Sequence, residues 1–193
     1  MSRMQLLVFL GASGVCALAL AHPGGAPHAD VQAGFAHPFA GLDHAVAALV
    51  VGWWAAAQSG SRRWLAPLLF VAMLGAGIAI GLRFGVPPGF EAGLAVTVIA
   101  LGALVVAYRH AGTVTALAII GVFALLHGAA HGSETPAGVL SAVTLYAAGL
   151  MLGTVALHAL GFVGGAALHR AAPALWRGAG IGVTCVGVLL LAH

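Results

Sequence analysis

The stretch PFAGLDHAVAALVVGWWAAAQ, residues 38–58, joins a long apolar run to one ionisable pair, Asp43 and His44. Its length matches the roughly 20 residues that an α-helix needs to cross the hydrocarbon core of a bilayer. Ionisable side chains are costly inside a membrane, so those that occur there usually face the interior of a bundle and mark pathways or sites. The stretch therefore predicts a membrane-spanning helix with a functional pair near its beginning.

The composition of the whole chain agrees with that reading. Hydrophobic residues make up 62% of the 193 residues, charged residues only 6%, and there is no lysine; the mean hydropathy is +1.09. About a quarter of an average soluble chain is charged, so this chain has too little charge to solvate a globule. The net charge of +3 comes from a few arginines and indicates no nucleic-acid partner. The predicted surroundings are a lipid bilayer.

Five further apolar stretches follow, separated by turn signals and charges. They cover residues 64–82, 91–108, 112–130, 136–165 and 173–192. We therefore predict an all-α membrane protein, with a six-helix transmembrane bundle over residues 37–193.

The N-terminus has the pattern of a secretory signal peptide, residues 1–21. Arg3 precedes an apolar core that is short for a span and ends in Ala19-Leu20-Ala21, which is the arrangement that signal peptidase cleaves. An uncleaved first helix is the alternative. Residues 22–36 (HPGGAPHADVQAGFA) have no periodicity and are expected to form a short periplasmic loop rich in His, Pro and Gly.

The arginines predict the orientation of the bundle. With six spans and the mature N-terminus outside, only Arg83 lies on the outer side. The arginines on the cytoplasmic side are then Arg62, Arg63, Arg109, Arg170 and Arg177. Cytoplasmic loops of membrane proteins carry such an excess of positive charge. We expect a multi-pass protein of the bacterial inner membrane with both mature termini in the periplasm.

This topology brings histidines and carboxylates from two distant stretches to the outer half of the membrane. The first span opens with a histidine and carries the Asp–His pair; the fourth runs outward and ends in two histidines, with a glutamate in the loop beyond. The predicted metal ligands are His37, Asp43, His44, His127, His131 and Glu134. Each also has a structural reading: a histidine can serve only in packing, an Asp–His pair can cap a helix, and residues 131–136 can form a polar turn.

Helical spacing refines the expected arrangement. His127 and His131 stand at i and i+4, on one helix face about 6 Å apart, which suits metal chelation with a third ligand from elsewhere. Gly128 and Gly132 would leave this region open to close approach. His37 and His44 stand at i and i+7, about 10 Å apart along one helix, and are expected to form two successive stations. Asp43 could orient His44 or bind the ion itself.

Three further residues are weaker candidates. Glu91 begins the third span on the outer side, where it adds negative charge or favours a helix N-terminus. His158 in the fifth span could be an exit ligand or a structural hydrogen-bonding group. His22 would offer an amine and an imidazole after cleavage. The small-xxx-small pairs Gly149/Gly153, Gly161/Gly165 and Gly178/Gly182 are expected to pack helices.

The donor types narrow the choice of metal. Nitrogen-rich, carboxylate-assisted sites favour nickel, cobalt, zinc or copper(II) over magnesium or calcium. Cys16 would leave with the signal peptide, and Cys185 alone builds neither a disulfide nor a thiolate site. The residues by themselves indicate a divalent late transition metal.

At these positions the sequence resembles the HupE/UreJ family of membrane proteins. Residues 37–44, HPFAGLDH, match its pattern HPxxGxDH, and residues 123–134, FALLHGAAHGSE, resemble its second histidine block. The start of the family's third span resembles residues 88–91 (PGFE). Its fifth-span pattern resembles residues 146–149 (YAAG), together with Thr154 and His158. The resemblance implies a secondary permease that takes up Ni²⁺, sometimes Co²⁺, through the six candidate ligands, and that is associated with hydrogenase or urease maturation.

The sequence thus predicts a permease for Ni²⁺, with Co²⁺, Zn²⁺ and Cu²⁺ as alternatives, rather than an enzyme. The expected partners are the ion, the bilayer, and a metallochaperone or maturation machinery; no prosthetic group is expected. There is no P-loop, so uptake would run on the membrane potential, a proton gradient or an external motor subunit. The alternatives are a zinc-dependent intramembrane hydrolase, and a metal-binding sensor or assembly factor without transport.

Overall fold

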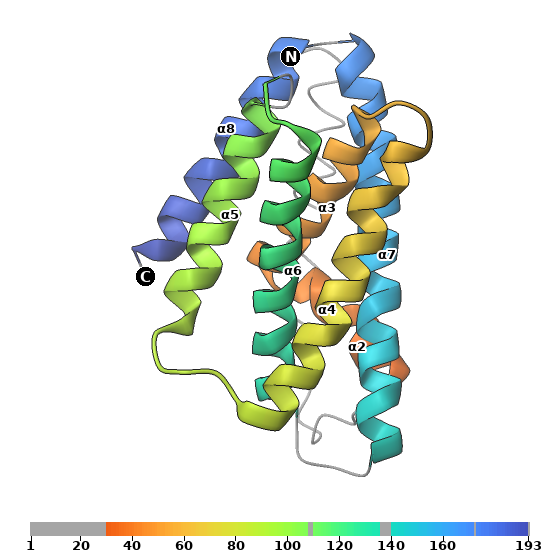
Figure 1. Ribbon diagram of the computed structural model, residues 1–193, viewed down its shortest axis with the longest axis vertical. Helices are drawn as coiled ribbons and strands as arrows, with labels where there is room; N and C mark the ends of the chain where they lie inside the picture. Colours follow the sequence, from red (N-terminus) through yellow and green to blue (C-terminus); the bar gives the residue numbers. More distant parts are fainter. Residues whose placement is uncertain (1–29, 108–109, 136–139, 172, 193) are drawn as a thin grey trace.

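The computed structural model describes residues 30–107, 110–135, 140–171 and 173–192. The predicted signal peptide and most of the following segment, His22 included, lie outside the described residues. The described part of the chain is helical and contains no strand (Figure 1). Its helices are α2 (Val31–Ala40), α3 (Leu42–Ala56), the 3-10 helix η2 (Gly60–Trp64), α4 (Leu65–Phe84), α5 (Phe90–Val106), α6 (Thr113–Glu134), α7 (Leu140–Ala171) and α8 (Pro173–Leu191). The all-α prediction is confirmed.

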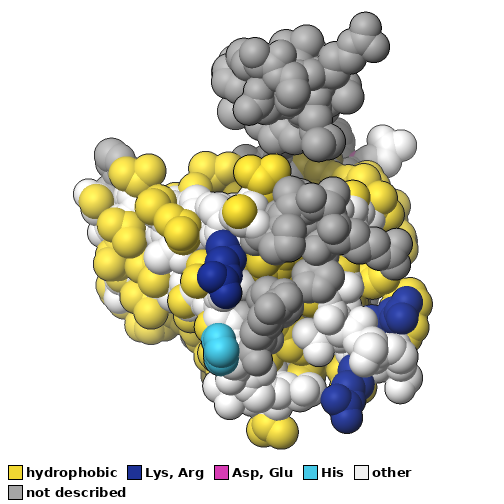
Figure 2. All heavy atoms as spheres, turned by 90° about the horizontal axis from the view of Figure 1, so that it is seen from above, with side chains coloured by type: hydrophobic (Ala, Val, Ile, Leu, Met, Phe, Trp, Pro, Cys, Tyr) yellow, Lys and Arg dark blue, Asp and Glu magenta, His cyan; other side chains and the backbone are white. Residues whose placement is uncertain are grey.

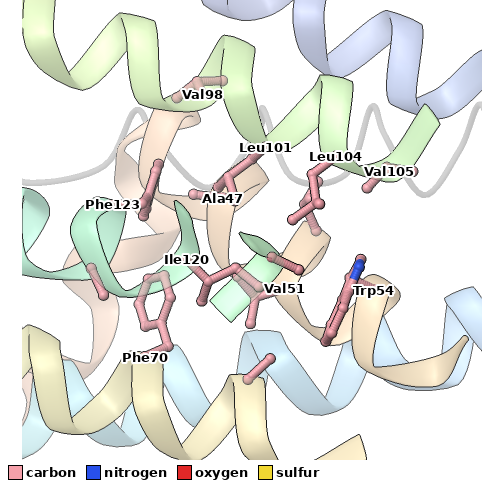
Figure 3. Close-up of a cluster of buried hydrophobic side chains, with 14 of the residues drawn as sticks. Ala47, Val51, Trp54, Phe70, Val98, Leu101, Leu104, Val105, Ile120 and Phe123 are labelled. Carbon is pink, nitrogen blue, oxygen red and sulfur yellow. The ribbon is translucent and has the colours of Figure 1, made fainter. Parts of the chain in front are cut away.

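The helices form an elongated bundle in which neighbours pack lengthwise (Figure 1). The most extensive contacts join α4 to α6, α5 to α8, and α7 to both α2 and α3. Helix α3 also touches α4, α5 and α8, so it connects the parts of the bundle. The buried core between them is built largely from Trp54, Phe70, Leu101, Ile120, Phe123 and Trp176, several of which are shown in Figure 3.

The first predicted span is broken into two helices. Helices α2 and α3 meet at Gly41, which is extended (φ −91°, ψ 122°), and their axes bend by 87°. Pro38 lies inside α2, where its ring removes a backbone donor, and the glycine then ends the helix. The expectation of one continuous helix over residues 38–58 is therefore wrong. The loop expected over residues 22–36 is also wrong for residues 31–36, which are helical because the Asp30 side chain accepts a hydrogen bond from the Ala33 amide at 2.8 Å and caps α2.

Two glycine pairs let α4 and α6 approach at backbone distance. Gly77 and Gly81 on α4 face Gly128 and Gly132 on α6, and a Cβ added to any of the four would overlap a carbonyl oxygen of the other helix. Such small-xxx-small pairs allow close packing of helices in lipid. Gly128 and Gly132 thus permit the close approach expected from the sequence, and the segment that approaches them is the α4 backbone. We call these four residues the glycine seam.

The other small-residue pairs behave differently from one another. Gly149 and Gly153 pack against the α2 backbone, and Gly161 and Gly165 pack against α3, as expected. A Cβ on Gly178 or Gly182 would meet nothing within 4 Å among the described residues. The packing expected for that last pair is wrong within this chain, because that face of α8 points away from the bundle.

Four of the described helical segments are long and apolar enough to cross a membrane: Gly60–Phe84, Thr113–Glu134, Leu140–Ala167 and Ala174–Leu191. The bent pair α2 and α3 would be a fifth span, and α5, at 17 residues, is apolar but shorter. Large apolar side chains such as Val114, Leu140 and Phe84 are more than 75% exposed, and a surface of that kind suits lipid. Multiple apolar spans make this a multi-pass membrane protein; the count of six stays a prediction.

Three of the arginines lie at one end of the bundle and the candidate ligands towards the other, where α4 ends with Arg83. Arg62 and Arg63 are in η2, and Arg177 is near the start of α8; both elements lie at the upper end in Figure 1. Figure 2 looks onto this end and shows arginine side chains spread across it. The junction of α2 with α3 and the end of α6 lie towards the other end. The orientation itself, with this arginine end in the cytoplasm, stays a prediction from the positive-inside rule.

Candidate metal site

The break at Gly41 turns two histidines of the first span towards the last turns of α6. The His37 ring centroid lies 4.7 Å from that of His131, and the His44 centroid lies 4.3 Å from His131 and 4.9 Å from His127. His37 and His44 are themselves 6.1 Å apart. The separation of about 10 Å expected on one straight helix is thus wrong, because the bend folds the two rings towards each other.

The six candidate ligands form two groups of three. One group is His37, His131 and Glu134; the other is Asp43, His44 and His127. Within each group, one potential ligand atom per residue lies within 4.8 Å of the others. Each group takes donors from the α2–α3 region and from α6, so both depend on how these elements pack. We call them the outer group and the inner group, respectively, because Glu134 is exposed whereas His127 is buried.

Asp43 orients the imidazole of His44. Nδ1 of His44 donates to Oδ1 of Asp43 over 2.8 Å, which leaves the lone pair on Nε2. A Cβ on Gly41 would come within 2.6 Å of His44 Nδ1 and 3.0 Å of Asp43 Oδ1. A larger residue at this position would therefore crowd the hydrogen-bonded Asp43–His44 pair.

His127 is held in the same way from within its own helix. Its Nδ1 donates to the carbonyl oxygen of Phe123 over 3.2 Å, so its lone pair also lies on Nε2. That atom is 3.9 Å from Oδ2 of Asp43, too far for a hydrogen bond. Two donor atoms that share a transition-metal ion, each at about 2.1 Å, lie up to about 4 Å apart. Asp43 can thus both orient His44 and bind an ion together with His127.

The ligand nitrogens are buried without partners. Nε2 of His44, Nε2 of His127 and Nδ1 of His131 have no hydrogen bond among the described residues. Leaving a buried polar atom unpaired costs on the order of 1–3 kcal/mol, and three such atoms lie close together here. They border a small cavity of about 10 Å³, room for about one water molecule. A cation in this region would satisfy these nitrogens at once.

The structure changes two details of the sequence-based arrangement. His127 and His131 fall in different groups of three, and each of them joins donors from the α2–α3 region. Glu134 is the last residue of α6 rather than part of the loop beyond it, and residues 131–134 are helical, which excludes the polar-turn reading for them.

The weaker candidates stay outside both groups. Glu91 is exposed in the first turn of α5. His158 is buried on α7. His22 lies outside the described residues.

Three aromatic residues near the ligands were missed by sequence reasoning. The Phe123 ring stacks on His127 with centroids 3.8 Å apart, and its position four residues earlier on one helix face is a signal that could have been noticed. Phe70 lines the cavity, and the Tyr146 ring stands edge-on to His37 at 5.8 Å. These two come from α4 and α7, so no local pattern reveals them.

The role of Asp43 leads to a direct prediction. Asp43→Asn keeps an oxygen that accepts from His44 but removes the negative charge beside the ligand nitrogens. Changes of this kind weaken metal binding by about 10- to 100-fold, which calorimetric titration of the purified protein with Ni²⁺ would measure. Asp30→Asn is the matched control: it removes a carboxylate that caps α2 outside both groups, and asparagine caps equally well. Equal nickel affinity in the two variants would contradict the role assigned to Asp43.

Fold and site together define a multi-pass helical membrane protein with a buried cluster of histidines and carboxylates. The family model described as "HupE / UreJ protein" matches residues 10–190. The chain is 38% identical to Protein HupE of Rhizobium leguminosarum bv. viciae over 194 residues, covering 99% of each sequence. No solved structure matches the chain. The protein belongs to the HupE/UreJ family, which confirms the resemblance seen in the sequence.

Proposed function

We propose that the protein is a permease for a divalent late transition-metal ion, with Ni²⁺ as the first candidate and Co²⁺ as the second. The observation that carries the proposal is the set of buried, unpartnered imidazole nitrogens that α6 and the α2–α3 region bring together. Two of the imidazoles are fixed by hydrogen bonds on Nδ1, so that Nε2 is free to bind.

The donor set selects the class of ion. Imidazole nitrogens assisted by carboxylates favour nickel, cobalt, zinc and copper(II), whereas copper(I) prefers sulfur ligands. Cys185 is exposed on α8 and belongs to neither group, so no cysteine among the described residues supplies a thiolate to them. Nickel stands first because of membership in the HupE/UreJ family, whose members are regarded as nickel and sometimes cobalt permeases. On the same ground, we propose that the ion supplies hydrogenase or urease maturation.

The two groups act in succession on one ion. His44 and His131, one from each group, have ring centroids only 4.3 Å apart. Two divalent ions about 5 Å apart would repel each other by on the order of 10 kcal/mol at an effective dielectric constant of about 20. Occupation of one group therefore excludes the other. The exposed Glu134 makes the outer group the point of capture, and the more buried inner group receives the ion next.

Uptake runs from the ligand end towards the arginine end. With the arginine end in the cytoplasm, the membrane potential favours cation entry by about 2.3 kcal/mol per charge for each 100 mV. A metal sensor that only binds the ion would need no route across the membrane.

A hydrolase finds no support: the cavity beside the ligands, at about 10 Å³, has room for a water molecule but not for an organic substrate.

The deciding experiment is ion uptake into proteoliposomes that contain the purified protein. With an inside-negative potential, accumulation of Ni²⁺ above that of empty vesicles is expected, and parallel measurements with Co²⁺, Zn²⁺ and Cu²⁺ establish the selectivity. Binding of Ni²⁺ without any flux would replace transport by a sensor or assembly role. Zinc that survives dialysis, again without flux, would point to the hydrolase.

A further inference from the structure

A third buried histidine, besides His127 and His131, lies outside both ligand groups. His158 on α7 is only 4% exposed, and neither of its ring nitrogens has a hydrogen-bond partner among the described residues. A histidine kept only for packing would gain from at least one hydrogen bond, and an apolar side chain would fill the same place at lower cost. An unpaired imidazole at this depth therefore calls for a ligand.

The position of His158 connects it to the cavity beside the inner group. Thr154, one helical turn earlier on the same face of α7, lines that cavity together with His44 and His127. Helix α7 runs towards the arginine end of the bundle (Figure 1), so His158 lies one turn further along the proposed direction of uptake.

The ring of Phe70 stands between the cavity and His158. Phe70 lines the cavity, and its ring meets the His158 ring edge-on, with centroids 4.9 Å apart and an angle of 89°. On its other side it lies 5.7 Å from Phe123, which stacks on His127. Figure 3 shows Phe70 on α4 and Phe123 on α6 at one side of the hydrophobic cluster. Phe70 therefore contacts both the cavity and His158.

We propose that His158 is an inner station for the same divalent transition-metal ion, reached from the Asp43–His44–His127 group through the cavity beside Phe70. This inference rests on the proposed transport function. The imidazole supplies one nitrogen ligand, and water molecules that travel with the ion complete its coordination. A site with a single protein ligand holds the ion weakly, which suits a station from which it is released onwards.

The first test separates binding from flux. His158→Leu should lower the rate of Ni²⁺ uptake into proteoliposomes by about tenfold or more, because the ion loses its ligand in the apolar interior. The tight Ni²⁺ binding of the detergent-solubilised variant should match wild type, since the outer and inner groups are intact and only the weak station is lost. His110→Leu is the matched control, because His110 is exposed near the arginine end, and it should transport like wild type. A size-exclusion profile and thermal unfolding curve like those of wild type establish that the leucine variant is folded.

The second test distinguishes a ligand from a packing residue. His158→Cys, in a chain in which Cys16 and Cys185 are replaced by alanine, exchanges the nitrogen ligand for a sulfur ligand that prefers softer ions. The ratio of Cd²⁺ to Ni²⁺ uptake should rise relative to the same background with His158, whereas a residue that only fills space would leave that ratio unchanged.

The outcomes separate the two proposals. Flux through the wild-type protein that persists in His158→Leu would overturn the inner station alone. An unchanged ratio of Cd²⁺ to Ni²⁺ uptake in His158→Cys would likewise overturn the inner station alone. Absence of flux through the wild-type protein would overturn transport and the inner station together.

Discussion

Replacing His127 by alanine is expected to abolish Ni²⁺ accumulation, and His44→Ala is expected to do the same. Each change removes one of the two imidazole ligands of the inner group, and loss of a ligand weakens metal binding at least as much as the 10- to 100-fold typical of losing a supporting residue. Removing His127 also opens a space beside Asp43, whose Oδ2 faces the missing ring at 3.9 Å. Uptake into proteoliposomes would then fall to the level of empty vesicles.

The same variants should still insert and fold. His127 makes its hydrogen bond only to Phe123 within α6, and alanine is the best helix former. Matching membrane yield and thermal unfolding would show that the loss concerns the ion rather than the fold. His110→Ala, at an exposed histidine, serves as the control. Normal uptake in both His44→Ala and His127→Ala would defeat the assignment of the inner group.

The second large effect concerns the glycine seam. Gly128→Leu is expected to destabilise the bundle strongly, because a Cβ at this position would overlap the carbonyl oxygen of Leu74 and lie 3.0 Å from the Gly77 Cα. Overpacking a well-packed interior costs about 1–3 kcal/mol, and here the obstacle is backbone, which cannot rotate away. Helices α4 and α6 would have to separate, and His127, next to Gly128, would move with α6.

Thermal unfolding in detergent and the yield of monodisperse protein measure this effect, and Ni²⁺ titration should show weaker binding. Gly182→Leu is the matched control: it places the same side chain in a membrane-spanning helix, at a position where a Cβ meets nothing within 4 Å. If Gly128→Leu unfolded at the same temperature as Gly182→Leu, the close approach of α4 and α6 at this seam would be ruled out.

Local patterns were enough for the helices and for the identity of the candidate ligands. Apolar length and turn residues located the last five helical segments with ends within six residues of those observed, but they missed the break of the first span at Gly41. Gly85 and Gly89, with φ of 69° and 79°, flank the Pro-Pro turn between α4 and α5. Asp43, His44 and His127 stood out because ionisable side chains are rare in so apolar a chain. The orientation of the bundle followed from arginine placement and stays a prediction of the sequence.

The grouping of the ligands depended on the tertiary fold. A spacing of seven residues placed His37 and His44 far apart on one helix, but an 87° bend at Gly41 brings their rings to 6.1 Å. A spacing of four residues pairs His127 with His131 along α6, and only the fold shows that each also joins donors from the α2–α3 region, in separate groups of three. Helical periodicity cannot reveal such a rearrangement, because it assumes that the helix continues.

The sequence by itself determined that this protein is helical, lies in a membrane and carries imidazoles and carboxylates where lipid would not tolerate them unpaired. Those properties depend on composition and on short-range spacing, which each stretch of chain carries alone. Only the tertiary structure decided which donors face one another, which glycines bring α4 against α6, and that Phe70 separates His158 from the cavity. These are contacts between distant segments, and they arise from the packing of whole helices rather than from any one stretch.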